Sequence, residues 1–185
     1  MIVTREISID YGHTLPNHFG FCNQIHGHRA RIVAHFEGDV KTTKDNFYLP
    51  DNGMVVDFGF CKKLLLNTIH EQLDHGFAVW ENDTNAIAVP VSVEYDNEGV
   101  ATTGILVSTL QFIKARNRKV VVCSAPPTAE YLAEWAFRLI NKDFALYEES
   151  NTVKLIKIEW WETPNNCAIY EPASSRFVQL DKEGE

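Results

Sequence analysis

The stretch that decides the fold is FCNQIHGHRARIVAHFEG, which runs from Phe21 to Gly38. From position 26 onward its β-branched and apolar residues predict a β-strand. Side chains two residues apart in a strand share a face, so His26 and His28 should lie close enough to bind one metal ion. Zinc favours imidazole nitrogen, and a catalytic zinc commonly has three protein ligands and one open position. The alternative is that both are ordinary strand histidines, because short motifs of this kind are common.

A zinc site of this kind needs a third ligand. His13 is the best candidate, because it ends a first predicted strand that should pair with the second as a hairpin. His18 is a weaker candidate, since it lies in the loop between the two strands, which is marked by Pro, Gly and Asn. His35 has the opposite strand parity from His28 and should face away. The remaining candidates are His70 and His75.

Cys22 lies four residues before the first histidine of the motif, and three interpretations of it stay open. Its sulfur could complete a closed site with three histidines, which would make the zinc structural. It could instead act as a thiolate base beside the metal, where positive charge would lower its pKa. A buried, inert thiol is the third interpretation.

Composition excludes several classes of partner. The chain has 185 residues, enough for one domain with a real core. Its formal net charge is −8 and no run rich in Lys and Arg occurs, which argues against nucleic acid or an anionic membrane as the main partner. No apolar run reaches the roughly 18 residues of a membrane helix, and MIVTREISIDYGH lacks the pattern of a signal peptide. Without close Cys-x-x-Cys pairs, we expect free thiols and a cytoplasmic location.

The rest of the chain predicts two amphipathic helices and further strands. Residues 60–75 place apolar side chains on one helical face after Asp57, a plausible N-cap. Residues 126–144 form a second helix with Thr128 as N-cap, and 153–162 alternate as a strand that could pair with 166–171. This order indicates an α+β domain with helices on one face of an antiparallel sheet.

The segment from Val79 to Ser124 is the least readable part of the chain. Residues 89–95 and 100–107 flank DNEG, a turn sequence, and so predict a hairpin. Residues 108–118 predict a short helix, and residues 119–124, KVVVCS, predict a strand.

Two further groups carry possible chemistry. Asp74 precedes His75 at the end of the first helix, and a carboxylate can orient and charge an imidazole for proton transfer. The alternative is a histidine placed favourably at a helix C-terminus. Glu162 stands beside two tryptophans in WWETPNN, where a carboxylate among aromatic rings suits a flat, guanidine-like heterocycle. It could equally be a turn acid before Pro164.

Four blocks, in order, carry a resemblance to one family. They are YGHTLPNH leading into CNQIHGHRARI, then GMVVDFG with LDHGF, then PPTAEYLAEW, then WETPNNCAIY. The chain resembles the 6-pyruvoyl-tetrahydropterin synthase / 6-carboxy-tetrahydropterin synthase family, and the family's Cys-x-x-x-His-Gly-His motif is fully present at 22–28. The poorest match, at about 87–118, looks like an insertion.

The resemblance implies a tunnelling fold, which is a four-stranded antiparallel sheet with two helices packed on one face, here with an inserted hairpin. Residues 1–185 would form a single domain with the insertion at about 87–118. The resemblance also implies a homo-oligomer, a hexamer of two trimers, with active sites between subunits. Sheet edges left unpaired within one chain would fit such assembly.

The resemblance also implies a role for each candidate residue. Zinc would be the cofactor and 7,8-dihydroneopterin triphosphate the small-molecule substrate. The zinc ligands would be His13, His26 and His28. Cys22 would be the general base, and Asp74 with His75 would be the proton-transfer pair. Glu162 would anchor the pterin, and Thr128 would form part of the pterin pocket.

Two reactions run on this scaffold. One breaks a carbon–carbon bond and yields 6-carboxy-tetrahydropterin and acetaldehyde, on the route to 7-deazaguanines such as queuosine. The other keeps the side chain and yields a 6-pyruvoyl product. The compact loop HTLPNHFGFCNQIHGHR resembles microbial members of the 6-carboxy branch, which we therefore favour. A ring protein that binds zinc and pterin without turnover is a further alternative, although it would not need a base and a proton-transfer pair.

Overall fold

The computed structural model describes residues 1–42, 52–83, 86–89, 105–108 and 119–173. Its main feature is a six-stranded sheet in the order β6-β3-β1-β2-β7-β8. The bounds of these strands are β1 Ile2–His13, β2 His26–Gly38, β3 Gly76–Trp80, β6 Val120–Cys123, β7 Val153–Thr163 and β8 Asn166–Tyr170.

The sheet contains the predicted antiparallel unit but is larger than predicted. Strands β1, β2, β7 and β8 are antiparallel neighbours, as the sequence indicated. Strand β3 pairs parallel with β1, and β6 pairs parallel with β3, so the sheet is mixed and has six strands rather than four. Parallel pairing requires a long crossover, and the first helix supplies it between β2 and β3. The backbone N–H of His75 then donates to the carbonyl of Asp10 on β1, 2.7 Å away, at the start of β3.

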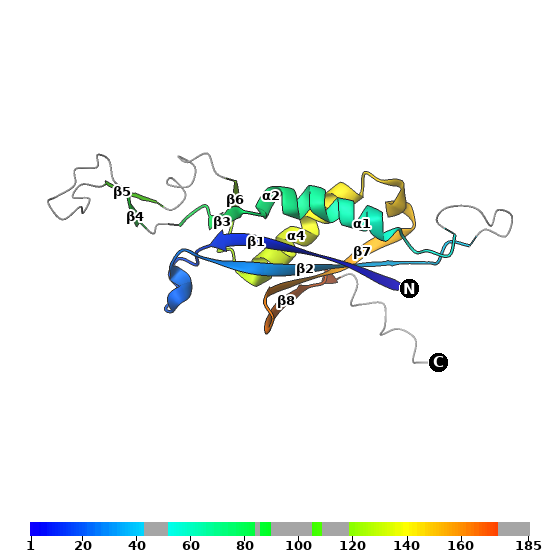
Figure 1. Ribbon diagram of the computed structural model, residues 1–185, viewed down its shortest axis with the longest axis horizontal. Coiled ribbons are helices and arrows are strands. Elements are labelled where there is room, and N and C mark those ends of the chain that lie inside the picture. The colour runs from blue at the N-terminus through cyan, green and yellow to red at the C-terminus, as the bar shows by residue number, and fades with distance from the viewer. Residues whose placement is uncertain (43–51, 84–85, 90–104, 109–118, 174–185) are drawn as a thin grey trace.

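Two helical runs cover one face of the sheet, as predicted (Figure 1). The first comprises α1 (Phe58–Leu65), a π-type stretch (Leu66–His70) and α2 (Glu71–Leu73). The second is α4 (Ala129–Phe144). Both predicted N-caps are confirmed: the Asp57 carboxylate accepts the backbone N–H groups of Gly59 and Phe60, and the Thr128 hydroxyl accepts that of Tyr131. The α+β class with helices on one face is therefore confirmed.

Strand alternation separates the core face of the sheet from a polar one. On β1 the odd-numbered side chains Ile7 and Ile9 are buried beneath the helices, and on β2 the even-numbered Ile32 and Phe36 are buried with them. The other face carries ion pairs such as Arg29–Asp10 and Arg31–Glu6. By the same parity, His13, His26 and His28 lie at the end of the core face, next to the start of α4.

The segment predicted to be an insertion overlaps a small two-stranded sheet. Strand β4 (Ala86–Val89) pairs antiparallel with β5 (Ile105–Ser108). This pairing agrees with the predicted hairpin, since its register is centred close to DNEG. The predicted turn itself, and the predicted helix 108–118 beyond Ser108, lie outside the described residues. The strand predicted from KVVVCS is β6.

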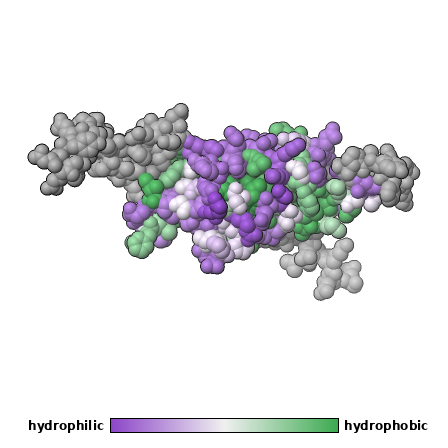
Figure 2. Space-filling model, viewed as in Figure 1, coloured by the Kyte–Doolittle hydropathy of each residue, from purple (hydrophilic) through white to green (hydrophobic). Residues whose placement is uncertain are grey.

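The face of the molecule that Figure 1 presents, with helices and sheet side by side, is largely hydrophilic. Figure 2 shows hydrophilic side chains over much of this view, with hydrophobic ones in separate groups. Within the described residues, no helix is both long enough and apolar enough to cross a membrane.

Candidate active site

Three histidines converge where β1 and β2 meet the start of α4. His13 lies opposite His26 in the β1–β2 register, and His28 follows two residues later on the same face. One ligand atom from each histidine lies within 4.8 Å of the others, and the described residues hold no other group of this kind. The structure thus brings together the three histidines predicted to bind metal. His18, His35, His70 and His75 lie outside the group.

A glycine before His13 and one between His26 and His28 allow the strands to approach each other here. Gly12 and Gly27 lie opposite each other in the register. A Cβ atom at Gly27 would meet the Tyr11 carbonyl oxygen at 2.8 Å, and one at Gly12 would meet the Phe77 ring at 2.7 Å. A side chain at either position would therefore force the backbone or the ring apart. The middle residue of His-Gly-His is thus required by packing as well as by spacing.

Hydrogen bonds fix the ring nitrogen that His13 and His26 offer. The Nδ1 atoms of His13 and His26 each lie 2.8 Å from a backbone carbonyl oxygen, that of Pro127 and that of Gln24 respectively. A carbonyl oxygen only accepts, so each Nδ1 carries the proton and each neutral imidazole leaves a lone pair on Nε2. These two Nε2 atoms lie 3.0 Å apart, and Nε2 of His28 is buried without a hydrogen-bond partner.

This arrangement fits a bound metal ion. Lone pairs that face each other repel, and a cation placed among them converts the repulsion into coordination. The Nδ1–H···O=C bonds orient the rings as outer-shell partners of metal-binding histidines commonly do. Burial lowers the pKa of both His13 and His28, although the nearby Glu162 acts against this, so both imidazoles are neutral at neutral pH and available as ligands.

Glu162, at the end of β7, reaches the histidines from the side. Its Oε1 atom lies 3.6 Å from Nε2 of His13 and 3.8 Å from Nε2 of His28. The same oxygen accepts a hydrogen bond from the Tyr11 hydroxyl, 3.0 Å away. Burial, together with the negative charge of Glu162, raises the pKa of Tyr11, so the phenol keeps its proton. Tyr11 was not among the predicted site residues, although it shares the strand parity of His13.

The two predicted substrate-binding residues line one cavity. This cavity has a volume of about 310 Å³, and its walls include Thr128 and Glu162 together with His18 and Asn166. Thr128 comes directly after Pro127, whose carbonyl oxygen holds His13. The start of α4 therefore contributes both to the cavity wall and to the histidine group.

Asp74 and His75 form the predicted pair at the end of the first helical run. Nδ1 of His75 donates to Oδ2 of Asp74 at 2.9 Å, and Oδ1 of Asp74 accepts the backbone N–H of Asp10 at 2.9 Å. Nε2 of His70 lies 3.2 Å from the same Oδ2. Burial acts to raise the pKa of Asp74, but these donors outweigh it and hold that pKa below its usual range. The i, i+4 spacing of His70 and Asp74 was the signal that could have found the second imidazole.

Cys22 stands apart from this pair. It lies in the short 3₁₀ turn Phe21–Asn23, half-buried, and its carbonyl oxygen accepts the backbone N–H of Leu15. Within the described part of the chain, no hydrogen bond joins Cys22 to the three histidines or to His75. Cys22 is also absent from the group of possible metal ligands, so the closed site of three histidines and a cysteine is not formed.

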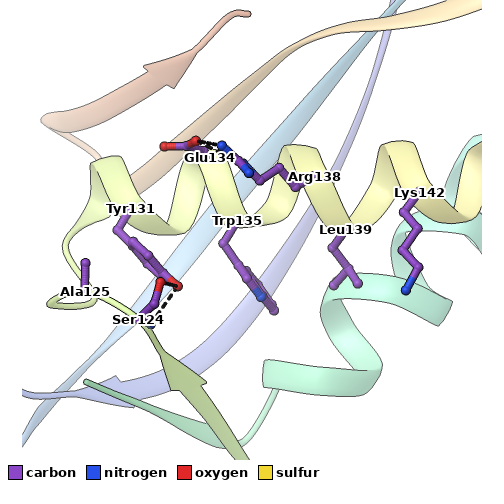
Figure 3. Close-up of a pocket in the computed structure, with 8 residues that line it drawn as sticks. All are labelled: Ser124, Ala125, Tyr131, Glu134, Trp135, Arg138, Leu139 and Lys142. Atoms are coloured by element: carbon purple, nitrogen blue, oxygen red, sulfur yellow. Dashed lines mark hydrogen bonds and ion pairs between the residues drawn. The ribbon is translucent and has the colours of Figure 1, made fainter. Parts of the chain in front are cut away.

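A larger hollow lies on α4, away from the histidines. It has a volume of about 570 Å³ and contains none of the predicted site residues. Figure 3 shows Tyr131, Trp135 and Leu139 pointing to one side of the helix, while Glu134 and Arg138 pair with each other on the other side. Of its two cations, Arg138 is paired with Glu134 and Lys142 is not part of any group of possible metal ligands among the described residues, so this hollow offers no comparable metal chemistry.

Solved structures share this fold. An uncharacterized protein from Wolinella succinogenes superposes with a TM-score of 0.60 at 20% identity, covering 92% of this chain and 97% of that chain. A 6-pyruvoyl tetrahydropterin synthase from Plasmodium vivax superposes with a TM-score of 0.59 at 15% identity, covering 93% of this chain and 98% of that chain. The fold is therefore the tunnelling fold, as predicted.

The fold and the histidine group together define a candidate metalloenzyme of the tunnelling-fold class. The chain belongs to the 6-pyruvoyl tetrahydropterin synthase family, whose sequence model matches residues 2–173. It is 24% identical over 169 residues to a 6-carboxy-5,6,7,8-tetrahydropterin synthase from Haemophilus influenzae, covering 91% of this chain and 97% of that protein. A relative of the same name from Rickettsia bellii is 30% identical over 162 residues, covering 88% of this chain and 94% of that protein. The predicted family and enzyme class, a lyase of the tetrahydropterin synthase type, are confirmed.

Proposed function

We propose that this protein is a zinc-dependent 6-carboxy-tetrahydropterin synthase. It converts 7,8-dihydroneopterin triphosphate and one water molecule to 6-carboxy-5,6,7,8-tetrahydropterin, acetaldehyde and triphosphate, on the route to 7-deazaguanines such as queuosine. The observation that carries the proposal is the convergence of three imidazoles beside a cavity lined by Glu162 and Thr128. The names of the Haemophilus influenzae and Rickettsia bellii relatives favour this reaction.

His13, His26 and His28 hold the metal. Three neutral imidazoles form a donor set that suits zinc, and His₃ is a known catalytic arrangement. When bound, zinc supplies positive charge that makes the hydroxyl groups of the substrate side chain more acidic. The two backbone carbonyls that fix the rings of His13 and His26 keep their Nε2 atoms aimed at the ion.

Glu162 binds the flat end of the substrate. The guanidine-like edge of a pterin presents N–H donors side by side, and a carboxylate can accept two of them at once. Tyr11 is bonded to one carboxylate oxygen and orients the group. Thr128, across the cavity, contributes a hydroxyl to the same wall.

Cys22 and the Asp74–His75 pair move the protons. Cys22 removes a proton from the substrate side chain, and His75 exchanges another through its exposed Nε2 while Asp74 holds Nδ1. Asp10, whose backbone binds Asp74, lies three residues before His13 on β1, which separates them by roughly 10 Å along the strand. Because the described chain does not join the two groups, we propose that the working form is a homo-oligomer, a hexamer of two trimers, in which a neighbouring subunit completes each site.

The 6-pyruvoyl reaction is the second candidate, favoured by the name of the family and of the Plasmodium vivax neighbour. The products separate the two reactions. Zinc-loaded protein is incubated with 7,8-dihydroneopterin triphosphate, and the pterin is identified by mass spectrometry while aldehyde is trapped as a hydrazone. A 6-carboxy-pterin with one equivalent of acetaldehyde is expected, and Cys22→Ala should reduce it strongly. A 6-pyruvoyl product would assign the sister reaction, and unchanged substrate would count against both.

A further inference from the structure

The Glu162 carboxylate lies on the boundary between the cavity and the histidine group. It lines the cavity together with Thr128, yet its Oε1 atom lies 3.6 Å from Nε2 of His13 and 3.8 Å from Nε2 of His28. Its side chain is only 20% exposed. A residue that only anchored the far end of a substrate would not need to approach two metal-binding nitrogens.

These distances resemble those between ligands of a single ion. Four ligand atoms at about 2.0–2.1 Å from a tetrahedral zinc lie roughly 3.3–3.4 Å from one another. The Nε2 atoms of His13 and His26 are 3.0 Å apart, and the two distances from Glu162 are only slightly longer. The carboxylate oxygen therefore lies at distances from Nε2 of His13 and His28 that are close to those between two ligands of one ion.

Tyr11 holds the carboxylate in this place. Its hydroxyl donates to Oε1 at 3.0 Å, and the residue is only 4% exposed. The ring is fixed by edge-on packing against His13 and Trp160, with centroid distances of 5.2 and 5.6 Å. A buried phenol without room to move is a fixed outer-shell donor, of the kind that orients metal-binding carboxylates.

We propose that, in the substrate-free protein, Glu162 is a displaceable fourth ligand of the metal, held in place by Tyr11. The metal is then closed to other ligands until a guanidine-like edge in the cavity binds the carboxylate and draws it away. Coordination by Glu162 depends only on the metal site, whereas displacement by a pterin also rests on the proposed function. Glu162 would therefore couple substrate binding to the release of a coordination position on the metal.

Cobalt-substituted protein tests coordination by Glu162 without a measurement of enzyme activity. The visible d–d absorption of Co²⁺ reports its ligands, and thiocyanate reports an accessible coordination position. We expect weak thiocyanate binding in the wild type and at least about tenfold tighter binding in Glu162→Gln, with Tyr11→Phe in between, since outer-shell changes typically alter metal sites 10–100-fold. Glu134→Gln, which changes an acid of α4 outside this cavity that pairs with Arg138, is the matched control and should behave as the wild type. Unsubstituted pterin should increase thiocyanate affinity in the wild type but not in Glu162→Gln.

Several outcomes would overturn the proposal, and they separate it from the proposed function. Circular dichroism first shows that Glu162→Gln and Tyr11→Phe are folded. Coordination by Glu162 would be excluded if both variants had the same cobalt spectrum and thiocyanate affinity as the wild type. A pterin without effect would exclude displacement. Failure of the wild type to bind cobalt would overturn the metal centre as well. If the cobalt spectra are as expected but no product forms from 7,8-dihydroneopterin triphosphate, the proposed reaction is overturned. The assignment of Glu162 as a metal ligand would remain supported.

Discussion

His13 and His26 face each other across the first two strands with their Nε2 atoms 3.0 Å apart, while a backbone carbonyl holds Nδ1 of each ring. Both rings therefore present lone pairs to the same point. His28 adds a buried nitrogen that has no hydrogen-bond partner. A metal ion bound at this point would coordinate all three nitrogens and so give each of them a partner.

Removing one of the three imidazoles should weaken zinc binding severely. For His28→Ala we expect the zinc dissociation constant to rise at least about 100-fold, beyond the 10–100-fold typical of losing an outer-shell partner. Competition with a chromophoric chelator measures it. His18→Ala is the control, since this exposed histidine lies outside the ligand group. Equal zinc affinity in His28→Ala and the wild type would contradict the assignment.

The Asp74 carboxylate should stabilise the fold in a pH-dependent way. Its folded-state pKa lies below the ordinary 3.8, so the stabilisation is present above that value and is lost as the pH falls through the depressed pKa. Asp74→Asn should lower the free energy of unfolding by about 1.5 kcal/mol near neutral pH, the lower end of the range for a hydrogen bond to a charged group. Urea unfolding of both proteins measures it. The difference should vanish at strongly acidic pH, and a difference that stays constant would disprove this cause.

His75, rather than His70, should exchange the proton. Both imidazoles contact Oδ2 of Asp74, but the His75 side chain is 79% exposed and that of His70 only 41%. His75→Gln should lower kcat about 10²–10⁴-fold, the usual range for losing a general acid or base, with KM little changed. Steady-state kinetics of His70→Gln, made in parallel, should show a far smaller loss. An equal loss in both variants would mean that the two imidazoles act as one unit.

Thr128 should contribute to stability separately from its place in the cavity. Its hydroxyl caps α4 by accepting the Tyr131 backbone N–H, and replacing such a cap by Ala typically costs about 1 kcal/mol. Thermal or urea unfolding should show this loss for Thr128→Ala and almost none for Thr128→Ser, which keeps the hydroxyl. Equal destabilisation by both would show that the methyl group matters instead of the cap.

Local signals predicted much of the molecule. Strand parity and the position of His13 at the end of a hairpin were enough to select it over His18 and His35, and the structure groups it with His26 and His28. Asp57 and Thr128 were found as N-caps because that preference depends on a few neighbouring residues.

Non-local contacts account for what the sequence did not predict. Strands β3 and β6 pair in parallel with distant partners, and the short run GFAVW carries no clear alternation, so the sheet was predicted too small. Tyr11 was not predicted as a site residue, because its contact with Glu162 depends on the distant strand β7, which places the carboxylate beside its hydroxyl. The role of the Pro127 carbonyl likewise depends on the packing of α4 against the end of β1, 114 residues away in sequence.

The most direct test of the account is zinc-edge X-ray absorption on zinc-loaded protein without substrate. We expect one zinc with a first shell of nitrogen and oxygen atoms at about 2.0–2.1 Å, the multiple scattering typical of three imidazoles, and no sulfur. A Zn–S distance of about 2.3 Å would place Cys22 on the metal and make the site structural. A zinc without imidazole scattering would contradict the three-histidine centre on which the proposed reaction depends.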